Sequence, residues 1–246
     1  MMLKGNRMQK YRITILIILL SNTCNAFDSL PMKIQGSDKN ISASLLADGI
    51  SIPWAMVQLP SGEILISDRK GEVRVFKNGS LLSKRITGLP EIHSHRQGGL
   101  LDLALHPDFA KNQWIYFTYA SKSGKKEGSN TALMRATLNI SNLSLTDKKL
   151  IYKAQPNSTK GQHYGSRIVF DDKGYIYFSV GDRGQRDVLP QDISKDGGKI
   201  YRLHDDGKIP SDNPFVNLAD AKSAVFSYGH RNPQGLSIDP TTQNIW

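Results

Sequence analysis

The chain has 246 residues, a formal net charge of +10 and a single cysteine, Cys24. Its lysines and arginines are scattered rather than clustered with aromatic residues, so the composition argues against a nucleic-acid-binding face. One cysteine excludes an internal disulfide framework, and the 39% of hydrophobic residues must therefore hold one sizeable core by packing alone.

The first 26 residues have the layout of a secretory signal peptide. Four basic residues precede an apolar run over residues 13–20, and the segment ends on Cys24, Asn25 and Ala26. The run is shorter than the about 20 apolar residues that span a bilayer, so it predicts no stable membrane anchor. We expect cleavage after Ala26, a periplasmic or extracellular location, and one mature domain over residues 27–246. Its charge falls to +6, because the leader carries four basic residues and no acidic one.

A sequence motif of two short β-rich runs joined by a turn of Pro, Asp or Gly occurs four times, and each copy is here called a hairpin phrase. The paired runs cover residues 54–59 and 63–67, 100–105 and 114–118, 168–170 and 175–179, and 235–238 and 245–246. Each phrase predicts an antiparallel hairpin. No long stretch has an apolar period of 3.6 residues, so the fold is expected to be all-β. The repetition favours a β-propeller over a sandwich, with about four blades' worth of sequence.

The fourth phrase reaches Trp246 in the middle of its second run. An open ring would leave sheet edges exposed, which favours aggregation. We therefore expect the chain to be a C-terminally truncated propeller whose remaining blades are missing, and we expect the 246-residue chain alone to be inactive.

Four segments contain more Gly, His, Arg and amide residues than structural strands need. They cover residues 96–102, 161–167, 181–185 and 228–236. Three of them come directly before a predicted inner strand, and the one at 181–185 follows the second strand of its hairpin. In a propeller the loops at the inner strands form the mouth of the central channel, so these segments predict a site there.

Three of these regions, at residues 97–109, 180–184 and 229–236, resemble the PQQ-dependent soluble glucose and aldose sugar dehydrogenases, also called the glucose/sorbosone dehydrogenase family. Residues 199–215 are similar to the same family, and the resemblance covers about residue 52 to the end. It implies a six-bladed propeller that holds pyrroloquinoline quinone (PQQ) and Ca²⁺ at the channel mouth. The family's calcium ligands lie mostly in a backbone segment that would come beyond Trp246, so no metal ligand is identifiable in this chain.

The resemblance also implies roles for two catalytic residues. His163 would be the general base that takes the proton of the anomeric hydroxyl while hydride moves from C1 of the sugar to the quinone. Imidazole suits this role because it titrates close to neutral pH. Arg231 would lie at the quinone oxygen where negative charge develops, and a fixed guanidinium stabilises that charge. Structural alternatives are a turn histidine and an ion pair at a blade junction.

Three amide residues complete the implied site. Asn232 would hydrogen-bond the quinone, although it also begins an Asn-Pro turn. Gln97 would lie near both sugar and quinone, because an amide donates to and accepts from hydroxyls, with a turn position as the alternative. Gln162 stands where some family members have an acidic residue beside the base, so the preferred sugar stays open.

Other polar residues in these segments predict structural roles. His106 is expected to fix a blade turn, with Asp108 accepting backbone N–H groups. His230 is expected to pack beside Arg231. Asp182 and Arg183 are expected to pair with each other across a blade junction rather than to act in catalysis.

The leading interpretation is a quinoprotein oxidoreductase that oxidises aldoses at C1 to lactones and passes electrons to an external acceptor, such as a quinone, a cytochrome or a dye. A cofactor is required because no side chain stores a hydride. The alternatives are a non-catalytic propeller that binds a partner and a Ca²⁺-dependent propeller lactonase or hydrolase. Retention of His163, Arg231 and Asn232 argues against a scaffold, and the scarcity of gathered carboxylates argues against a hydrolase.

Overall fold

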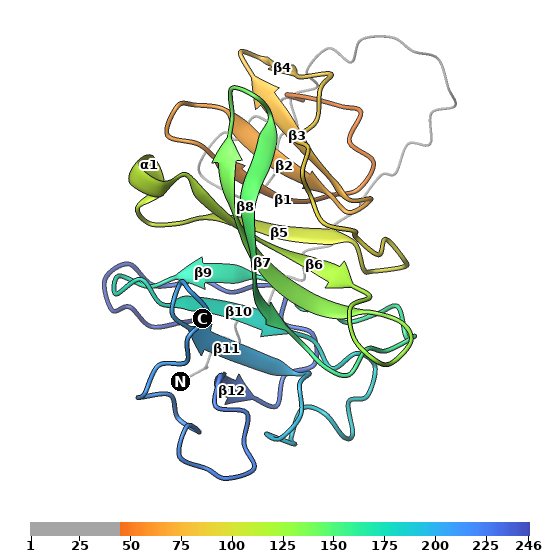
Figure 1. The fold of residues 1–246 in the computed structure, drawn as a ribbon, viewed down its shortest axis with the longest axis vertical. Helices are drawn as coiled ribbons and strands as arrows, with labels where there is room; N and C mark the ends of the chain where they lie inside the picture. The colour runs from red at the N-terminus through yellow and green to blue at the C-terminus, as the bar shows by residue number, and fades with distance from the viewer. Residues whose placement is uncertain (1–44) are drawn as a thin grey trace, which may run out of the picture. The chain divides into compact units, whose positions relative to one another are not determined.

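The structure, a computed structural model, describes residues 45–246 of the chain. Residues Leu46–Trp246 form one compact unit in which three four-stranded antiparallel sheets follow one another (Figure 1). The leader predicted over residues 1–26 lies outside the described residues. No helix in the described part is long and apolar enough to cross a membrane.

Each sheet is built from strands that are consecutive in the chain, and the connections range from tight turns to the long segments at residues 181–198 and 204–224. The first sheet contains β1 (Pro53–Gln58), β2 (Ile64–Asp68), β3 (Glu72–Lys77) and β4 (Ser80–Leu81). The second contains β5 (Leu100–Leu105), β6 (Trp114–Ser121), β7 (Asn130–Asn139) and β8 (Ser144–Lys153), with the short α1 (Phe109–Asn112) between β5 and β6. The third contains β9 (Ile168–Phe170), β10 (Ile176–Val180), β11 (Lys199–Leu203) and β12 (Val225–Tyr228).

The all-β prediction is confirmed, and the first three hairpin phrases are the first two strands of the three sheets. The fourth phrase also begins to pair. Ser237 and Trp246 exchange backbone hydrogen bonds of 2.9 and 2.8 Å, and Ile238 forms a bridge with Ile245. The described residues therefore hold three complete propeller blades and the start of a fourth.

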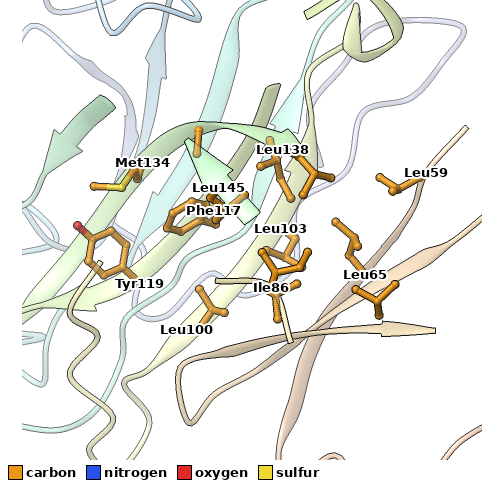
Figure 2. Close-up of a cluster of buried hydrophobic side chains, with 14 of the residues drawn as sticks. Leu59, Leu65, Ile86, Leu100, Leu103, Phe117, Tyr119, Met134, Leu138 and Leu145 are labelled. Carbon is orange, nitrogen blue, oxygen red and sulfur yellow. The ribbon is translucent and has the colours of Figure 1, made fainter. Parts of the chain in front are cut away.

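Apolar side chains between successive sheets form the core. One cluster joins the first two sheets and includes Leu65, Ile86, Leu103 and Phe117 (Figure 2). A second cluster joins the second and third sheets through residues such as Tyr116 and Phe178. Because these side chains come from both facing sheets, apolar burial stabilises the stacking of one blade on the next.

Three buried hydroxyls, one in the second strand of each sheet, connect neighbouring inner strands. Each accepts a hydrogen bond from a backbone N–H in or directly before the first strand of its own sheet, and donates one to a backbone carbonyl in or just before the first strand of the next blade. These inter-blade hydroxyls are Ser67, which donates to Leu101 O at 2.6 Å, Thr118, which donates to Ser166 O at 2.8 Å, and Ser179, which donates to Pro233 O at 2.6 Å. Their matching N–H donors are Ala55, Asp102 and Arg167, at 3.0, 3.0 and 3.1 Å.

An ion pair supplements these bonds between the second and third blades. Arg167 Nη1 donates to Asp102 Oδ1 at 2.8 Å, and the other carboxylate oxygen accepts the N–H of Ile168 at 2.7 Å. Burial raises the pKa of Asp102 to about 6, although the nearby Arg167 guanidinium opposes the shift. The inner strands are thus fixed relative to one another, and the loops that precede them are held at one end of the sheets.

Candidate functional site

The loops at residues 161–167 and 181–185 approach each other so closely that only glycine fits at two positions. A Cβ on Gly165 would lie 2.8 Å from the backbone nitrogen of Gly181, and a Cβ on Gly181 would collide with the carbonyl of His163. Gly165 also has a φ of +63°, a conformation that glycine adopts without strain. The two glycines therefore bring the backbone of the predicted base against the end of β10.

His163 and Asp182 form the central contact of this junction. His163 Nδ1 lies 2.7 Å from Asp182 Oδ1, and the Asp182 side chain is fully buried. The same oxygen accepts the N–H of Gly184 at 2.7 Å, whereas Oδ2 has no partner among the described residues. A carboxylate accepts hydrogen bonds only, so Nδ1 is the donor, and in the neutral ring Nε2 keeps its lone pair.

Asp182 was expected to pair with Arg183, and that expectation is wrong, because its partner is His163. His163 and Asp182 are 19 positions apart, and only the approach of the two loops joins them. Asp182 is thus the site residue that the sequence analysis missed. The available signal was an acidic residue directly after the apolar β10 strand and its glycine.

Arg183 points instead into a nest of carbonyl oxygens beneath the His163 loop. Its guanidinium donates to the carbonyls of Gln162, of Lys160 at 2.9 Å and of Ser129 at 3.3 Å, and lies 3.5 Å from the ring centre of Tyr164. Burial lowers the pKa of Arg183. Its contacts fix the loop that carries His163, whose φ of +56° lies in the left-handed region.

Gln97 and Asn232 hold the same loop from two further segments. Gln97 Oε1 accepts the N–H of His163 at 2.8 Å, and Asn232 Oδ1 accepts the N–H of Gly165 at 3.0 Å. Neither side-chain NH₂ group has a partner within residues 45–246, so both remain able to donate to a bound molecule.

The other two predicted site residues lie on the rim. The exposed Gln162 places its amide over Gly184, where a Cβ would come within 2.6 Å of it. The carbonyl of Arg231 accepts the N–H of Asp182 at 2.7 Å, which joins its backbone to the junction. The Arg231 side chain is exposed and has no hydrogen-bond partner in the described part of the chain. The structure therefore brings His163, Gln97, Asn232 and Gln162 together and adds Arg231 through its backbone.

Two further histidines have structural contacts. His106 Nδ1 accepts the N–H of Asp108 at 3.0 Å, so the turn-fixing role is confirmed, but the acceptor is the imidazole. The Asp108 carboxylate forms no cap bond and pairs with Lys111 at 3.2 Å, which corrects the role expected of it. His230 Nε2 lies 2.9 Å from Ser227 Oγ, and burial lowers its pKa, with Lys199 adding to the effect.

No group of three or more His, Cys, Asp or Glu side chains that could share a metal ion occurs in residues 45–246. The site's polar groups are instead an imidazole with a carboxylate behind it, two amides with free NH₂ groups and a guanidinium on the rim. Such a set can accept a proton from a hydroxyl at His163 Nε2. It can also donate hydrogen bonds to an oxygen that becomes negative.

Comparison with known proteins adds an independent finding. Residues 50–246 match the family model described as Glucose / Sorbosone dehydrogenase. The chain is 38% identical over 218 residues to the aldose sugar dehydrogenase YliI of Escherichia coli, which covers 88% of this chain and 58% of that protein. The chain thus spans less than two thirds of that relative's length.

Solved structures agree with this match. The apo-form of the soluble aldose sugar dehydrogenase from Escherichia coli superposes with a TM-score of 0.78 at 38% identity, covering 82% of this chain and 58% of that one. The PQQ-bound form of the aldose sugar dehydrogenase from Streptomyces coelicolor gives a TM-score of 0.69 at 27% identity, covering 81% and 57%.

Proposed function

This chain belongs to the glucose/sorbosone dehydrogenase family, and from that premise we propose that it oxidises an aldose at C1 to the lactone, with hydride transfer to PQQ and onward passage of electrons to an external acceptor. The observation that carries the proposal is the His163–Asp182 pair, in which a buried carboxylate orients an imidazole at the predicted channel mouth. A related quinoprotein glucose dehydrogenase from Acinetobacter calcoaceticus, 29% identical, and the PQQ-bound relative support the choice of cofactor.

In this proposal His163 Nε2 accepts the proton of the anomeric hydroxyl. Asp182 holds the ring through Nδ1–H and stabilises the imidazolium that forms, since a positive charge beside a buried carboxylate is favourable. Gln97 fixes the backbone of the base and directs its free NH₂ toward the hydroxyls of the sugar. Gln162, on the rim beside the base, contacts the sugar through an uncharged amide.

The donors of the site suit the chemistry of PQQ, whose quinone and carboxylate oxygens accept hydrogen bonds. The free NH₂ group of Asn232 and the unpaired guanidinium of Arg231 are both donors without a protein partner in the described residues. Arg231 and Asn232, with Gln97, would therefore hold the cofactor. When bound, PQQ supplies the hydride acceptor that the protein's own side chains lack.

The described side chains do not form a calcium site. Calcium binds six to eight oxygen ligands, and Asp182, the buried carboxylate at this junction, already bonds His163 and Gly184. The calcium ligands stay a prediction: the family resemblance implies that backbone carbonyls beyond Trp246 would supply them.

The two alternatives fit this junction less well. A binding module has no need of a buried carboxylate behind a loop histidine. Burying a carboxylate costs free energy, and orienting a catalytic base would account for that cost. A metal-centred hydrolase would require several carboxylates at one point, whereas the donors gathered here are mainly imidazole and amide groups.

We further propose that the protein works outside the cytoplasm. The support is the signal-peptide pattern of residues 1–26, and this location suits a soluble or membrane-bound electron acceptor outside the cell membrane.

Replacement of His163 tests the proposal. In a full-length enzyme that contains this chain, with PQQ and calcium supplied, sugar-dependent dye reduction over several aldoses should fall at least about a hundredfold in His163→Ala, while PQQ binding stays nearly unchanged. His163→Asn should lose activity equally, because its amide can still donate to Asp182 but cannot serve as a base. His204→Ala, which removes a histidine packed on Tyr175, is the matched control and should keep full activity. Turnover within a fewfold of the unchanged protein in both His163 variants would rule out the base.

A further inference from the structure

Lysine side chains line a depression beside the candidate site. Two open hollows of about 600 and 400 Å³ are adjacent, because Lys126 and Pro156 line both, and the two together are here called the lysine trough. Its charged lining residues are Lys125, Lys126, Lys160, Lys195 and Lys222, with Glu127 as the single acidic side chain among them. Figure 1 shows the β6–β7, β8–β9 and β10–β11 connections, which supply most of this lining, at one end of the strands.

Asn157 builds one wall of the trough. This residue is 5% exposed, and its side-chain NH₂ donates to the carbonyls of Lys122 at 2.8 Å and Lys126 at 3.0 Å. Its oxygen accepts Lys153 Nζ at 2.7 Å. A buried amide with all these bonds made holds the β6–β7 connection in one position, so Lys125 and Lys126 project from a fixed loop.

Asp196 supports the lining of the larger hollow. It is 1% exposed and accepts the N–H of Gln155 at 2.7 Å and the hydroxyl of Tyr152 at 2.6 Å. Lys222 Nζ lies 3.3 Å from the same carboxylate. One buried acidic group therefore sets Gln155 and Lys222 on the lining of the larger hollow, in the way that a second layer of residues supports a binding site.

The trough keeps an excess of positive charge after local pairing. Lys195 pairs with Asp192 at 2.6 Å, and Lys222 pairs with Asp196. Lys125 and Lys126 form no ion pair within residues 45–246. The remaining lining includes hydroxyls and amides, among them Ser158, Thr159, Ser194 and Gln155. A concave surface that combines ammonium, hydroxyl and amide groups suits a chain that carries both anionic groups and hydroxyls.

One end of the trough reaches the candidate site. Lys160 Nζ donates to the carbonyl of Gly184 at 2.8 Å, and Gln185 lines the smaller hollow. Gly184 also lies under the side chain of Gln162 and donates its N–H to Asp182. A ligand in the trough would therefore end next to the His163–Asp182 pair.

We propose that the lysine trough binds an anionic oligosaccharide, with carboxylate or sulfate groups on the lysines and the reducing-end sugar at His163. The orientation rests on the proposed oxidation of an aldose, whereas binding in the trough does not. An acidic protein surface is a weaker fit, because acidic side chains on a broad protein surface reach a convex partner more easily than they reach into two hollows. The uncharged Gln162 agrees with an anionic substrate, since an acidic residue there would repel it.

Binding is measured by calorimetric titration of the 246-residue chain at low and physiological salt. The probes are a tetragalacturonate for carboxylate, a heparin tetrasaccharide for sulfate, neutral maltotetraose and hexaglutamate. We expect one or both anionic sugars to bind, with affinity that falls as salt rises, and maltotetraose not to bind. The Lys125→Gln/Lys126→Gln variant should weaken binding about fivefold, because each exposed charge contributes little alone. The exposed neighbouring pair in Lys148→Gln/Lys149→Gln makes the same charge change on β8 and should leave the affinity unchanged.

Three results would overturn the inference: no binding of either anionic sugar, equal weakening in both double variants, or hexaglutamate binding as tightly as the sugars. Titration needs no turnover, so a full-length enzyme that binds the anionic sugar but, with PQQ and calcium supplied, fails to oxidise any aldose would refute the proposed oxidation and leave the trough in place. Where turnover is present, the Lys125→Gln/Lys126→Gln variant should raise KM for the anionic sugar and not for a neutral monosaccharide.

Discussion

Asp182→Asn separates the charge of the carboxylate from its hydrogen bonds. In the structure Asp182 Oδ1 receives both His163 Nδ1–H and Gly184 N–H, and Oδ2 has no partner. An asparagine can keep its oxygen at the Oδ1 position and place its NH₂ where Oδ2 was, because the opposite orientation would set two donors against Gly184 and His163. We therefore expect the ring orientation and the protonated Nδ1 to persist, with only the negative charge removed.

The loss of the Asp182 charge determines how far turnover falls in Asp182→Asn. An imidazolium and a carboxylate whose charges lie roughly 4 Å apart attract each other by about 4 kcal/mol at an effective dielectric constant of about 20. Full loss of that stabilisation in the transition state corresponds to about a thousandfold in rate. The His163 side chain is 13% exposed, so solvent screens part of the charge. We expect turnover per PQQ-loaded site to fall between about 100-fold and 1000-fold.

The assay is dye reduction by the full-length enzyme with a saturating aldose, normalised to bound PQQ, together with ¹⁵N chemical shifts of the His163 ring. Asp187→Asn removes a negative charge from an 88% exposed neighbour and is the matched control, with an expected rate within about twofold of the unchanged protein. A loss below about fivefold in Asp182→Asn, with Nδ1 still protonated, would refute the charge argument. A ring protonated on Nε2 in the unchanged protein would refute the arrangement itself.

Arg231→Lys should lower turnover at least about tenfold with PQQ loading kept, because a point charge on a flexible stem does not reproduce the planar guanidinium; a near-normal steady-state rate would contradict this. Thr118→Val keeps the side-chain shape but leaves the carbonyl of Ser166 and the N–H of Asp102 unpaired, and should cost about 3 kcal/mol in urea unfolding, whereas an unchanged midpoint would contradict the role of the inter-blade hydroxyls. Asp102 has a folded-state pKa of about 6, above the unfolded value of 3.8, so its contribution to the free energy of unfolding falls as pH rises from about 4 to 6 and is constant above. Relative to Asp102→Asn, the unchanged protein should lose about 2 kcal/mol between pH 4 and pH 7, and parallel pH dependences would contradict that sign.

The sequence predicted the inner half of each blade better than the outer half. Residues 100–105 and 168–170 were expected as strands and are β5 and β9. These strands carry mostly apolar residues, because they face neighbouring blades on both sides. The outer strand β8, SLTDKKLIYK, has five consecutive exposed residues and no clear alternation, so its pairing with β7 gave no signal in the sequence.

The candidate site was predicted as a set of segments but not as a set of contacts. His163, Gln97 and Asn232 were identified through resemblance, and their hydrogen bonds place them together. The sequence did not reveal Asp182 as the partner of His163, because Asp182 and Arg183 are adjacent and such a pair suggests an ion pair between the two. The close approach of Gly165 and Gly181 decides the pairing instead, and that approach is a property of the folded backbone.

The inter-blade hydroxyls have a consequence for protein engineering. Ser67, Thr118 and Ser179 all donate to main-chain carbonyls of the next blade, and the carbonyl oxygen is present whatever residue stands there, even a proline at position 233. Adjacent blades therefore recognise each other partly through groups that substitution does not alter. Chimaeras that exchange a whole blade between distant relatives should keep this connection where the Ser or Thr is kept, whereas the Asp102–Arg167 ion pair requires both of its partners to be matched.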